Sequence, residues 1–462
     1  MEKEIQMTKG QRFSFMFTLL MGSFTMSISQ SSLSTAYPTL MKFFGVNATT
    51  IQWLTTGFML MMCIMMPVSP WLMNNVNFKW LYLGVMILFE FGTLMIVFAN
   101  TYWMALVGRL LEGMAVGIRF TTFQAVLLLI SPKEHRTQTM GFVGLVLGSA
   151  LACGPIISGI VLNYMKWQNL FWLFMIIIAI LIVMSLFSMQ DVVDRHAYHL
   201  DFVSVIYSVG LIGILYFINS LSNTHAFPAW LWIELAISVV LTVLFVYRNL
   251  HEKEPMLDLH VLKYVNFDIG VLLTGFSYIS LIVTTVVYPM FYQDILGKST
   301  LVSGLALVPP AVLLSILNPL TGKLAASIGM KPTLITGMAM ILVGWGGLFI
   351  GLNHLNMWTM IILACLIEGG NAFVMMPATT LGANSLPEEL IPHGTAVTTT
   401  ARQLLGSLGV ALAMMIIIAG GHTVQERVGY GHAFAFFFLL EVVGMIFALI
   451  IKSDKVEAEA KA

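Results

Sequence analysis

The stretch Leu106-Val107-Gly108-Arg109-Leu110-Leu111-Glu112-Gly113-Met114-Ala115-Val116-Gly117-Ile118-Arg119 places two arginines and a glutamate inside an apolar run of helical length. A charge at the centre of a bilayer costs about 2.5–3.5 kcal/mol on insertion scales, so such residues usually face a polar interior. Arg109 and Glu112 are three residues apart and are neighbours on one helix face. Arg119 follows Glu112 by seven residues, about two turns along a similar face. The stretch predicts a membrane helix with a functional charge cluster.

A second copy of the pattern lies 256 residues later, where Cys365-Leu366-Ile367-Glu368-Gly369-Gly370 aligns with Arg109-Leu110-Leu111-Glu112-Gly113-Met114. The glutamate and the glycine after it are kept, and a cysteine stands in place of the arginine. The repeat predicts two related halves around paired buried carboxylates, Glu112 and Glu368.

Composition places the whole chain in the membrane. Of its 462 residues, 58% are hydrophobic and 10% are charged, and its mean hydropathy is +0.89. Soluble proteins carry about 25% charged residues, so we expect an integral membrane protein of many helical spans. Lys+Arg and Asp+Glu both number 22, which suggests no nucleic-acid partner. The three cysteines lie in apolar runs and are expected to pack, not to bind metal.

The apolar runs predict fourteen transmembrane helices, because a span needs about 20 residues. The polar start leads into an apolar run that we expect to remain as the first span, without cleavage as a signal peptide. An even number of spans then places both termini on the same side of the membrane. Fifteen of the lysines and arginines fall on that side and four on the other. The excess of positive charge predicts that both termini are cytoplasmic. The runs lie near 13–36, 50–71, 78–99, 102–129, 139–163, 168–189, 200–221, 229–249, 266–292, 300–322, 331–352, 357–382, 395–419 and 431–451.

The repeat extends beyond the glutamates. Residues 70–79 and 322–331, which are 252 apart, are both short polar turns entering an apolar run, and they end in Lys79 and Lys331. We therefore expect a six-helix half over 1–190, two inserted helices with linkers over 191–264, and a second six-helix half over 265–462. Repeated halves with a site between them are the plan of many secondary transporters.

No motif indicates an enzyme. The sequence contains no Gly-x-x-x-x-Gly-Lys-Ser/Thr loop, no His-Glu-x-x-His and no Gly-x-Ser-x-Gly set between a strand and a helix. We expect no catalytic activity and no cofactor. Active transport without an ATP-binding domain would run on an ion gradient.

Several stretches resemble the fourteen-span drug/proton antiporter branch of the major facilitator superfamily. Those of the first half are Gln52-Trp53-Leu54-Thr55-Thr56-Gly57-Phe58 with Pro67, Gly108-Arg109-Leu110-Leu111-Glu112-Gly113, and Gly144, Gly148, Gly154-Pro155 and Gly159. Those of the second half are Tyr288-Pro289-Met290-Phe291-Tyr292-Gln293, Leu296-Gly297-Lys298-Ser299 with Gly304 and Pro309, and Thr400-Ala401-Arg402-Gln403-Leu404 with Gly406 and Gly409. The resemblance implies an all-α integral membrane protein of the major facilitator fold, with 14 transmembrane helices.

The chain also departs from the family pattern. The family usually has an aspartate in the first span, nine residues before a proline; here the proline is Pro38 and the position is Ser29. The cytoplasmic motif that normally carries Asp-Arg reads Asn74-Asn75, and its second copy reads Ala326-Ser327. A charge latch between helices is therefore weakened, and gating is expected to depend more on packing.

Glu112 and Glu368 are the candidate proton carriers. Burial favours the neutral form of a carboxyl group and a neighbouring arginine favours the charged form, so either site could exchange a proton. Arg109 would tune Glu112. The alternative is that Glu112 only forms a structural ion pair with Arg109 or Arg119. Glu90 and Glu441, also in apolar runs, rank second, and Glu234 is expected to reach water near the outer surface.

Further residues are assigned by position or by resemblance. Arg119 is expected either to face the cavity and favour an anionic or zwitterionic substrate, or to neutralise Glu112. The candidate substrate-binding residues are Ser29, Gln30, Ser34, Phe58 and Arg119. The candidate structural or gating residues are Gly154, Pro155, Lys79, Lys331 and Arg402. Ordinary helix packing is the alternative for the glycines.

These features together predict a multidrug efflux pump of the bacterial cytoplasmic membrane. It would export amphipathic compounds in exchange for protons, as a monomer, by rocking of the two halves. Two alternatives stay open: a dedicated transporter of a specific metabolite, lipid or peptide, suggested by Ser29 and Arg119, and a non-transporting scaffold of the same fold.

Overall fold

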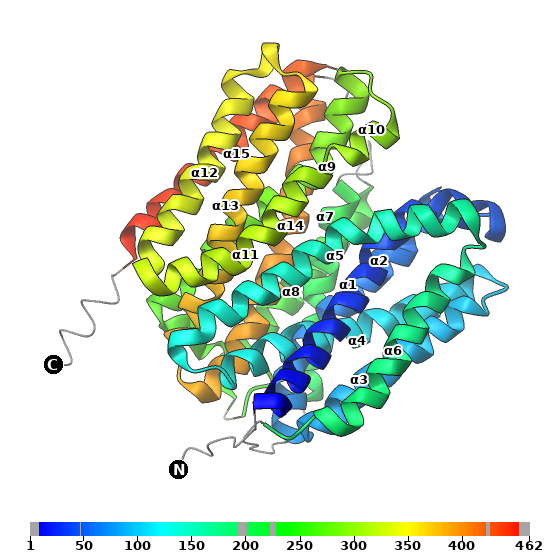
Figure 1. Cartoon of the computed structure of the whole chain (residues 1–462), viewed down its shortest axis with the longest axis vertical. Coiled ribbons are helices and arrows are strands. Elements are labelled where there is room, and N and C mark those ends of the chain that lie inside the picture. The colour runs from blue at the N-terminus through cyan, green and yellow to red at the C-terminus, as the bar shows by residue number, and fades with distance from the viewer. Residues whose placement is uncertain are drawn as a thin grey trace.

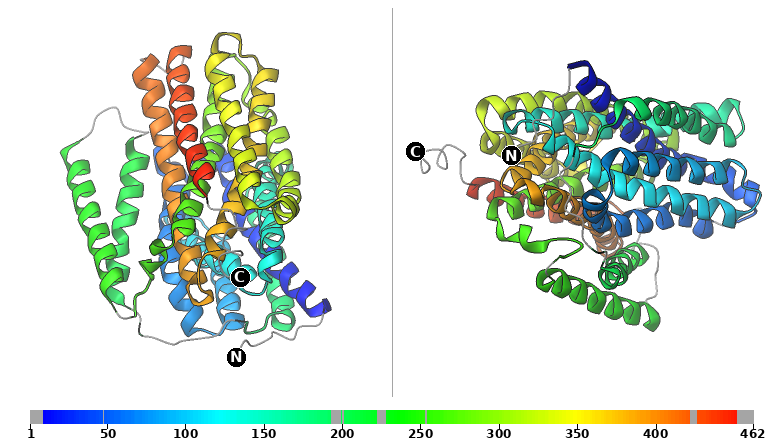
Figure 2. Two further views of the ribbon diagram at one scale, coloured as in Figure 1. Left: turned by 90° about the vertical axis from the view of Figure 1, so that its left-hand side faces the viewer. Right: turned by 90° about the horizontal axis from the view of Figure 1, so that it is seen from below.

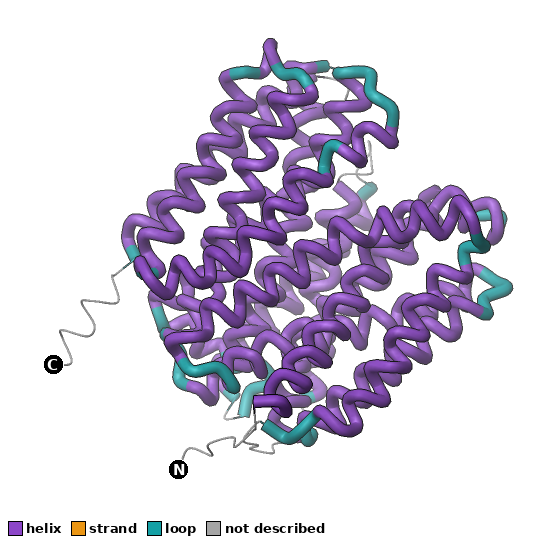
Figure 3. The backbone as a smooth tube through the Cα atoms, in the orientation of Figure 1, coloured by secondary structure: helices purple, strands orange, loops and turns teal. Residues whose placement is uncertain are grey.

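The computed structural model describes residues 9–46, 48–192, 199, 201–221, 228–252, 254–421 and 426–451. These residues form helices joined by short turns, with no strand among them (Figure 3). Fourteen of the helices in this described part have 20 or more residues. The all-helical fold expected from the apolar runs is confirmed.

The first six helices form the N-terminal half of the bundle (Figure 1). Within it, α2 and α3 both pack on α4, and α1 packs on α5. The helices are α1 (Lys9–Phe44), α2 (Ala48–Asn75), α3 (Phe78–Val97), α4 (Tyr102–Leu129), α5 (Arg136–Tyr164) and α6 (Gln168–Ser188).

The C-terminal half repeats these neighbours. Here α11 and α12 pack on α13, and α9 packs on α14. The helices are α9 (Val265–Met290), α11 (Val308–Ile328), α12 (Met330–Ile350), α13 (Met357–Asn384), α14 (Ile391–Gly421) and α15 (Arg427–Ile450), with the short α10 (Thr300–Leu305) between α9 and α11. The equivalence of α4 with α13 is the one that the repeated glutamates predict.

Two glycine contacts make this equivalence concrete. A Cβ on Gly108 of α4 would lie 2.6 Å from the carbonyl oxygen of Gly92 on α3, and a Cβ on Gly370 of α13 would lie 2.5 Å from the carbonyl oxygen of Gly337 on α12. Both helix pairs therefore approach at a distance that only glycine permits.

The remaining pair, α7 (Phe202–Leu221) and α8 (Ala229–His251), forms a hairpin beside the bundle (Figure 2). The inner helix α7 contacts α2 of one half and α14 of the other. The hairpin therefore lies along the seam between the halves. The domain boundaries near 190 and 264 stay predictions.

Eleven helices of the described chain are long and apolar enough to cross a membrane. In α7 the apolar helical stretch is shorter, Phe202–Ile218. The count of fourteen spans and the side on which the termini lie therefore stay predictions.

The caps of α4 and α13 set the depth of the two carboxylates. Thr101 caps α4 by accepting a hydrogen bond from the Met104 amide, and Asn356 and Thr359 form a capping box at the start of α13. Glu112 lies ten residues into α4 and Glu368 eleven into α13. At 1.5 Å per residue this is about 15 Å along each helix, half the thickness of a bilayer core of about 30 Å.

Candidate functional site

Glu112 forms an ion pair inside the N-terminal half. Its Oε2 accepts a hydrogen bond from Nη1 of Arg109 at 2.5 Å, and its Oε1 accepts one from the Thr93 hydroxyl of α3 at 2.6 Å. Arg109 also donates from Nε to the carbonyl of Leu54 and lies 4.3 Å over the ring of Phe58. Both charged side chains are completely buried. The carboxylate is thus neutralised and hydrogen-bonded on both oxygens.

Glu368 has different partners in the C-terminal half. Its Oε2 accepts a hydrogen bond from Nδ2 of Asn371 at 3.1 Å, and Oδ1 of Asn371 accepts one from the Ser277 hydroxyl of α9 at 2.8 Å. No lysine or arginine in the described chain forms a salt bridge with it. Its 5% exposure leaves it narrowly accessible. A buried carboxyl group without a cation is stable only in its neutral form.

A second buried carboxyl group of this half is Glu441 on α15. Its Oε1 accepts a hydrogen bond from the Ser280 hydroxyl at 2.6 Å, and Ser280 accepts one from the indole of Trp345 at 2.8 Å. Its Oε2 is buried without a partner among the described residues. Unlike Glu368, Glu441 is completely enclosed.

Arg119 lies apart from Glu112. Its guanidinium donates to the carbonyl of Leu19 and the sulfur of Met26, both on α1, and lies 5.3 Å over the ring of Tyr82 on α3. Of the two cations offered as partners of Glu112, the structure pairs it with Arg109. These contacts are within the N-terminal half, and a role of Arg119 in substrate binding stays a prediction.

The halves meet through glycines on the first part of α5. A Cβ on Gly141 would lie 2.7 Å from the Asn318 carbonyl of α11, and Gly144 and Gly148 face Asn318 and Ser315 of the same helix. Gly154 instead faces Ser31 of α1, within its own half, and nothing lies within 4 Å of a Cβ on Gly159. The halves therefore touch at the Arg136 end of α5, which lies beside the start of α1 because Arg12 donates to the Ile130 carbonyl.

An arginine that the motifs did not single out bridges the halves at this end. Arg136 donates from Nη1 to Oδ1 of Asn384 at 3.2 Å and from Nη2 to Oε1 of Glu388 at 3.1 Å, both in the C-terminal half. Its Nε donates to the carbonyls of Leu128 and Ser131. We call Arg136, Asn384 and Glu388 the Arg136 latch.

Arg402 lies in the same interface. Its guanidinium is 5.1 Å from the ring centre of Phe120 on α4 and 5.3 Å from that of Tyr278 on α9, and it is 3% exposed. Its Nη1 has no partner in the described part of the chain, and neither has the amide of Gln124, one turn beyond Phe120. A cation between rings of both halves fits the predicted gating role, which stays a prediction.

Lys79 and Lys331 occupy equivalent places, each inside its own half. Lys79 donates from Nζ to the carbonyl of Leu186 at the end of α6, and Lys331 donates to the carbonyl of Ile451 at the end of α15. Both lysines donate to carbonyl oxygens that are unpaired at a helix C-terminus, where the helix dipole favours a positive charge. The geometry supports a structural role, and gating by either lysine stays a prediction.

The polar residues of the first span are only partly described. The hydroxyl of Ser29 is buried without a hydrogen-bond partner in the described chain, and Gln30 is half-buried. The side chains of Ser34 and Pro155 lie outside the described residues. Substrate binding at Ser29, Gln30, Ser34 or Phe58 stays a prediction.

Comparison with known proteins assigns the fold. The sequence profile of the Major Facilitator Superfamily matches residues 19–410. The chain belongs to this superfamily. It is a membrane transporter with drug-resistance relatives: the lincomycin resistance protein LmrB of Bacillus subtilis is 31% identical, with 96% of each chain covered. The MFS-type transporter YhcA of Bacillus subtilis is 34% identical over 87% of this chain and 76% of its own.

Solved structures of the Major Facilitator Superfamily share the fold at low identity. The proton:xylose symporter XylE has a TM-score of 0.69 at 12% identity and covers 97% of both chains. The human organic anion transporter MFSD10 has a TM-score of 0.68 at 11% identity and covers 96% of this chain and 100% of its own. These similarities concern the arrangement of helices alone.

Proposed function

We propose that the chain is a proton-coupled antiporter that exports amphipathic drugs or toxic compounds across the cytoplasmic membrane by alternating access. Two groups of relatives support this substrate class. One comprises lincomycin resistance proteins at 29–31% identity, and the other includes the multidrug transporter MdtP of Bacillus subtilis at 25%. We further propose fourteen spans, both termini in the cytoplasm and a monomeric pump.

The contrast between the two carboxyl groups carries the proposal of proton coupling. Glu112 keeps its charge because Arg109 and Thr93 hold both oxygens. Glu368 has a neutral amide as its recorded partner and is slightly exposed. It therefore needs a proton when enclosed and can release it when water reaches it. We assign proton transfer to Glu368, and we assign to the Glu112–Arg109 ion pair the structural role of stabilising the packing of the N-terminal half.

The contacts between the halves suggest where the proton is taken up. α5 and α11 interlock at the end that bears the Arg136 latch, whereas Gly159 at the other end of α5 faces open space. With the termini in the cytoplasm this arrangement is outward-facing. Glu368 would be protonated here, the halves would rock, and proton release to the cytoplasm would accompany substrate binding.

Transport into inverted membrane vesicles tests the assignment, with lincomycin and a lipophilic fluorescent dye as probes. The wild type should take up probe when a proton gradient is imposed. Glu368→Gln should lose this uptake but still exchange labelled for unlabelled probe without a gradient. The matched control is Glu441→Gln, which changes a second buried carboxyl group of the same half and should keep gradient-driven uptake.

The other outcomes are equally informative. Loss of coupling in Glu441→Gln but not in Glu368→Gln would move the proton site to Glu441. Failure of the wild type to move either probe under a gradient would contradict drug export and favour a dedicated transporter of one metabolite, lipid or peptide.

A further inference from the structure

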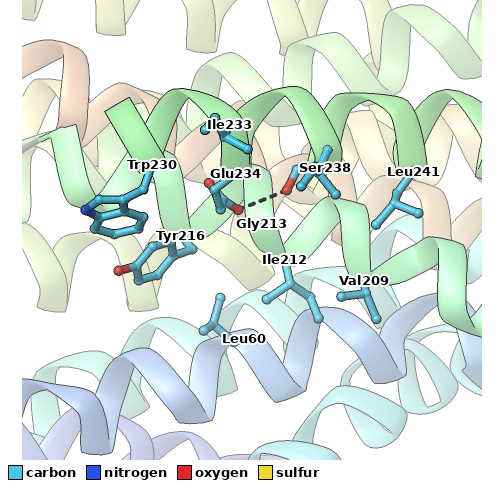
Figure 4. Close-up of a pocket in the computed structure, with 11 residues that line it drawn as sticks. Leu60, Val209, Ile212, Gly213, Tyr216, Trp230, Ile233, Glu234, Ser238 and Leu241 are labelled. Atoms are coloured by element: carbon cyan, nitrogen blue, oxygen red, sulfur yellow. Dashed lines mark hydrogen bonds between the residues drawn. The ribbon is translucent and has the colours of Figure 1, made fainter. Parts of the chain in front are cut away.

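The α7–α8 hairpin and α2 enclose a groove that the transport cycle described above does not use (Figure 4). Its volume is about 460 Å³, within the range of about 300–1,000 Å³ that small-molecule sites occupy. Its walls are mostly apolar side chains, among them Leu60, Val209, Ile212, Ile237 and Leu241. Ile237 is 55% exposed, so the groove opens on the outer surface of the bundle.

One carboxylate interrupts this apolar wall. Oε1 of Glu234 accepts a hydrogen bond from the Ser238 hydroxyl at 2.9 Å, drawn in Figure 4, whereas Oε2 is buried without a partner among the described residues. Gly213 of α7 lies against both side chains, and a Cβ there would be 2.5 Å from Oε1 of Glu234. The residues lining the groove include no lysine, arginine or histidine. The groove therefore holds an acceptor for which none of the described lining residues supplies a cation.

Tyr216 and Trp230 line the groove, and Trp53 stacks on Tyr216 outside the lining. The rings of Trp53 and Tyr216 stack at 5.8 Å between centroids, and those of Tyr216 and Trp230 lie 6.4 Å apart, so α2, α7 and α8 each contribute one ring. Aromatic faces attract organic cations. The cluster adds a second feature that favours a positively charged ligand.

The depth of Glu234 matches that of an amphiphile's polar group. Glu234 lies five residues after the start of α8 at Ala229, which is about 7 Å along the helix. Trp230 precedes it at the level where tryptophans mark the membrane interface. Amphipathic helices at a membrane surface keep their polar face at this boundary and bury their apolar face about 5–10 Å into it, and an amphipathic small molecule is expected to orient in the same way.

We propose that the groove binds an amphipathic organic amine that has partitioned into the membrane. Its ammonium group pairs with the carboxylate of Glu234 beside the ring of Trp230, and its apolar part lies along Ile212, Ile237 and Leu241. A phospholipid is disfavoured because its phosphate would face the carboxylate. Since α7 contacts both halves, the amine is held at their seam; its use as a loading site for export rests on the proposed function.

Photolabelling of the full-length protein in lipid nanodiscs tests the site. The probe is dodecylamine carrying a diazirine on its chain, and the comparison probe is the corresponding dodecanol. The amine should label peptides from residues 209–216 and 230–241. Glu234→Gln should reduce this labelling about tenfold, the effect of losing one charge-assisted hydrogen bond. Labelling by the alcohol should stay weak and unchanged.

Matched variants separate the groove from a general effect of charge or bulk. Ile237→Trp should block labelling by filling the groove, whereas Val240→Trp, which changes an exposed residue of the same helix outside the lining, should not. Glu252→Gln removes a carboxylate at the other end of α8, and it too should leave labelling intact. Monodisperse elution of each variant verifies that it folds.

Three results would overturn the proposal: equal labelling by amine and alcohol, amine labelling that survives Glu234→Gln, or a co-purified phospholipid that the amine does not displace. The variant Glu368→Gln, which should lose only gradient-driven uptake, should bind the amine as the wild type does. Labelling at the groove in a protein that transports no probe would refute the proposed function and leave the site standing.

Discussion

Removing the carboxylate of the Arg136 latch should shift the protein away from the conformation described here. The side chain of Arg136 is 1% exposed and that of Glu388 is 59% exposed. Exposed ion pairs contribute about 0.2–1 kcal/mol, and breaking a buried pair costs about 3–5 kcal/mol. With the carboxylate largely in water, we take about 1 kcal/mol for Glu388→Gln, a shift of roughly fivefold in the conformational equilibrium.

Adding Asn384→Ala removes the second bond between the halves. Arg136 still donates from Nε to the carbonyls of Leu128 and Ser131 and so stays anchored in its own half. If the second hydrogen bond contributes about another 1 kcal/mol, the double variant should shift the equilibrium roughly thirtyfold. The perturbation acts on the interface and leaves each half packed.

Electron–electron distance measurements between spin labels report the equilibrium. The labels are attached to cysteines introduced at Lys133 and Ser327, two exposed residues in different halves at the latch end. The three native cysteines are first replaced so that only these two positions react. The population of long distances should rise in Glu388→Gln and further in the double variant. Glu389→Gln, at the exposed neighbouring carboxylate, is the control. Identical distance distributions for the Glu388 and Glu389 variants would refute the latch.

Three further changes test other parts of the structure. Glu112→Gln should lower the free energy of unfolding by about 3–5 kcal/mol, because it leaves the buried Arg109 without a countercharge. Adding Arg109→Met should recover most of this loss, and denaturant unfolding measures both changes. Gly144→Ala should impair closure of α5 on α11 and reduce vesicle transport, whereas Gly159→Ala, in open space, should transport normally. Lys79→Met should cost about 1 kcal/mol by uncapping α6, visible as a lower Tm with transport retained.

The elements followed from the sequence because long apolar runs admit few structures in a membrane. The pairing of Arg109 with Glu112 was also predictable, since both lie on one helix face at a spacing of three. The absence of an arginine beside Glu368 was visible as Cys365 in the second copy of the motif. Each of these features could be predicted because it depends on residues within one helix or on comparison of the two copies of the repeat.

Contacts between helices distant in sequence were not predictable in this way. Arg119 binds groups on α1 and α3, and its two-turn spacing from Glu112 gave no sign of them. No sequence motif marks Arg136, because its partners Asn384 and Glu388 lie some 250 residues away. Likewise, Gly144 and Gly154 belong to one motif, yet they face different helices.

The two copies of the glutamate motif now have a physical reason to differ. In the first half an arginine three residues before the glutamate supplies the countercharge, so Glu112 can stay ionised and structural. In the second half Cys365 supplies none, and the carboxyl group relies on Asn371. Without a cation among its described partners, Glu368 is the carboxyl group that we propose to take up and release a proton as the halves rock. On the proposed mechanism, this one residue difference between the repeats separates a structural carboxylate, Glu112, from a proton-carrying one, Glu368.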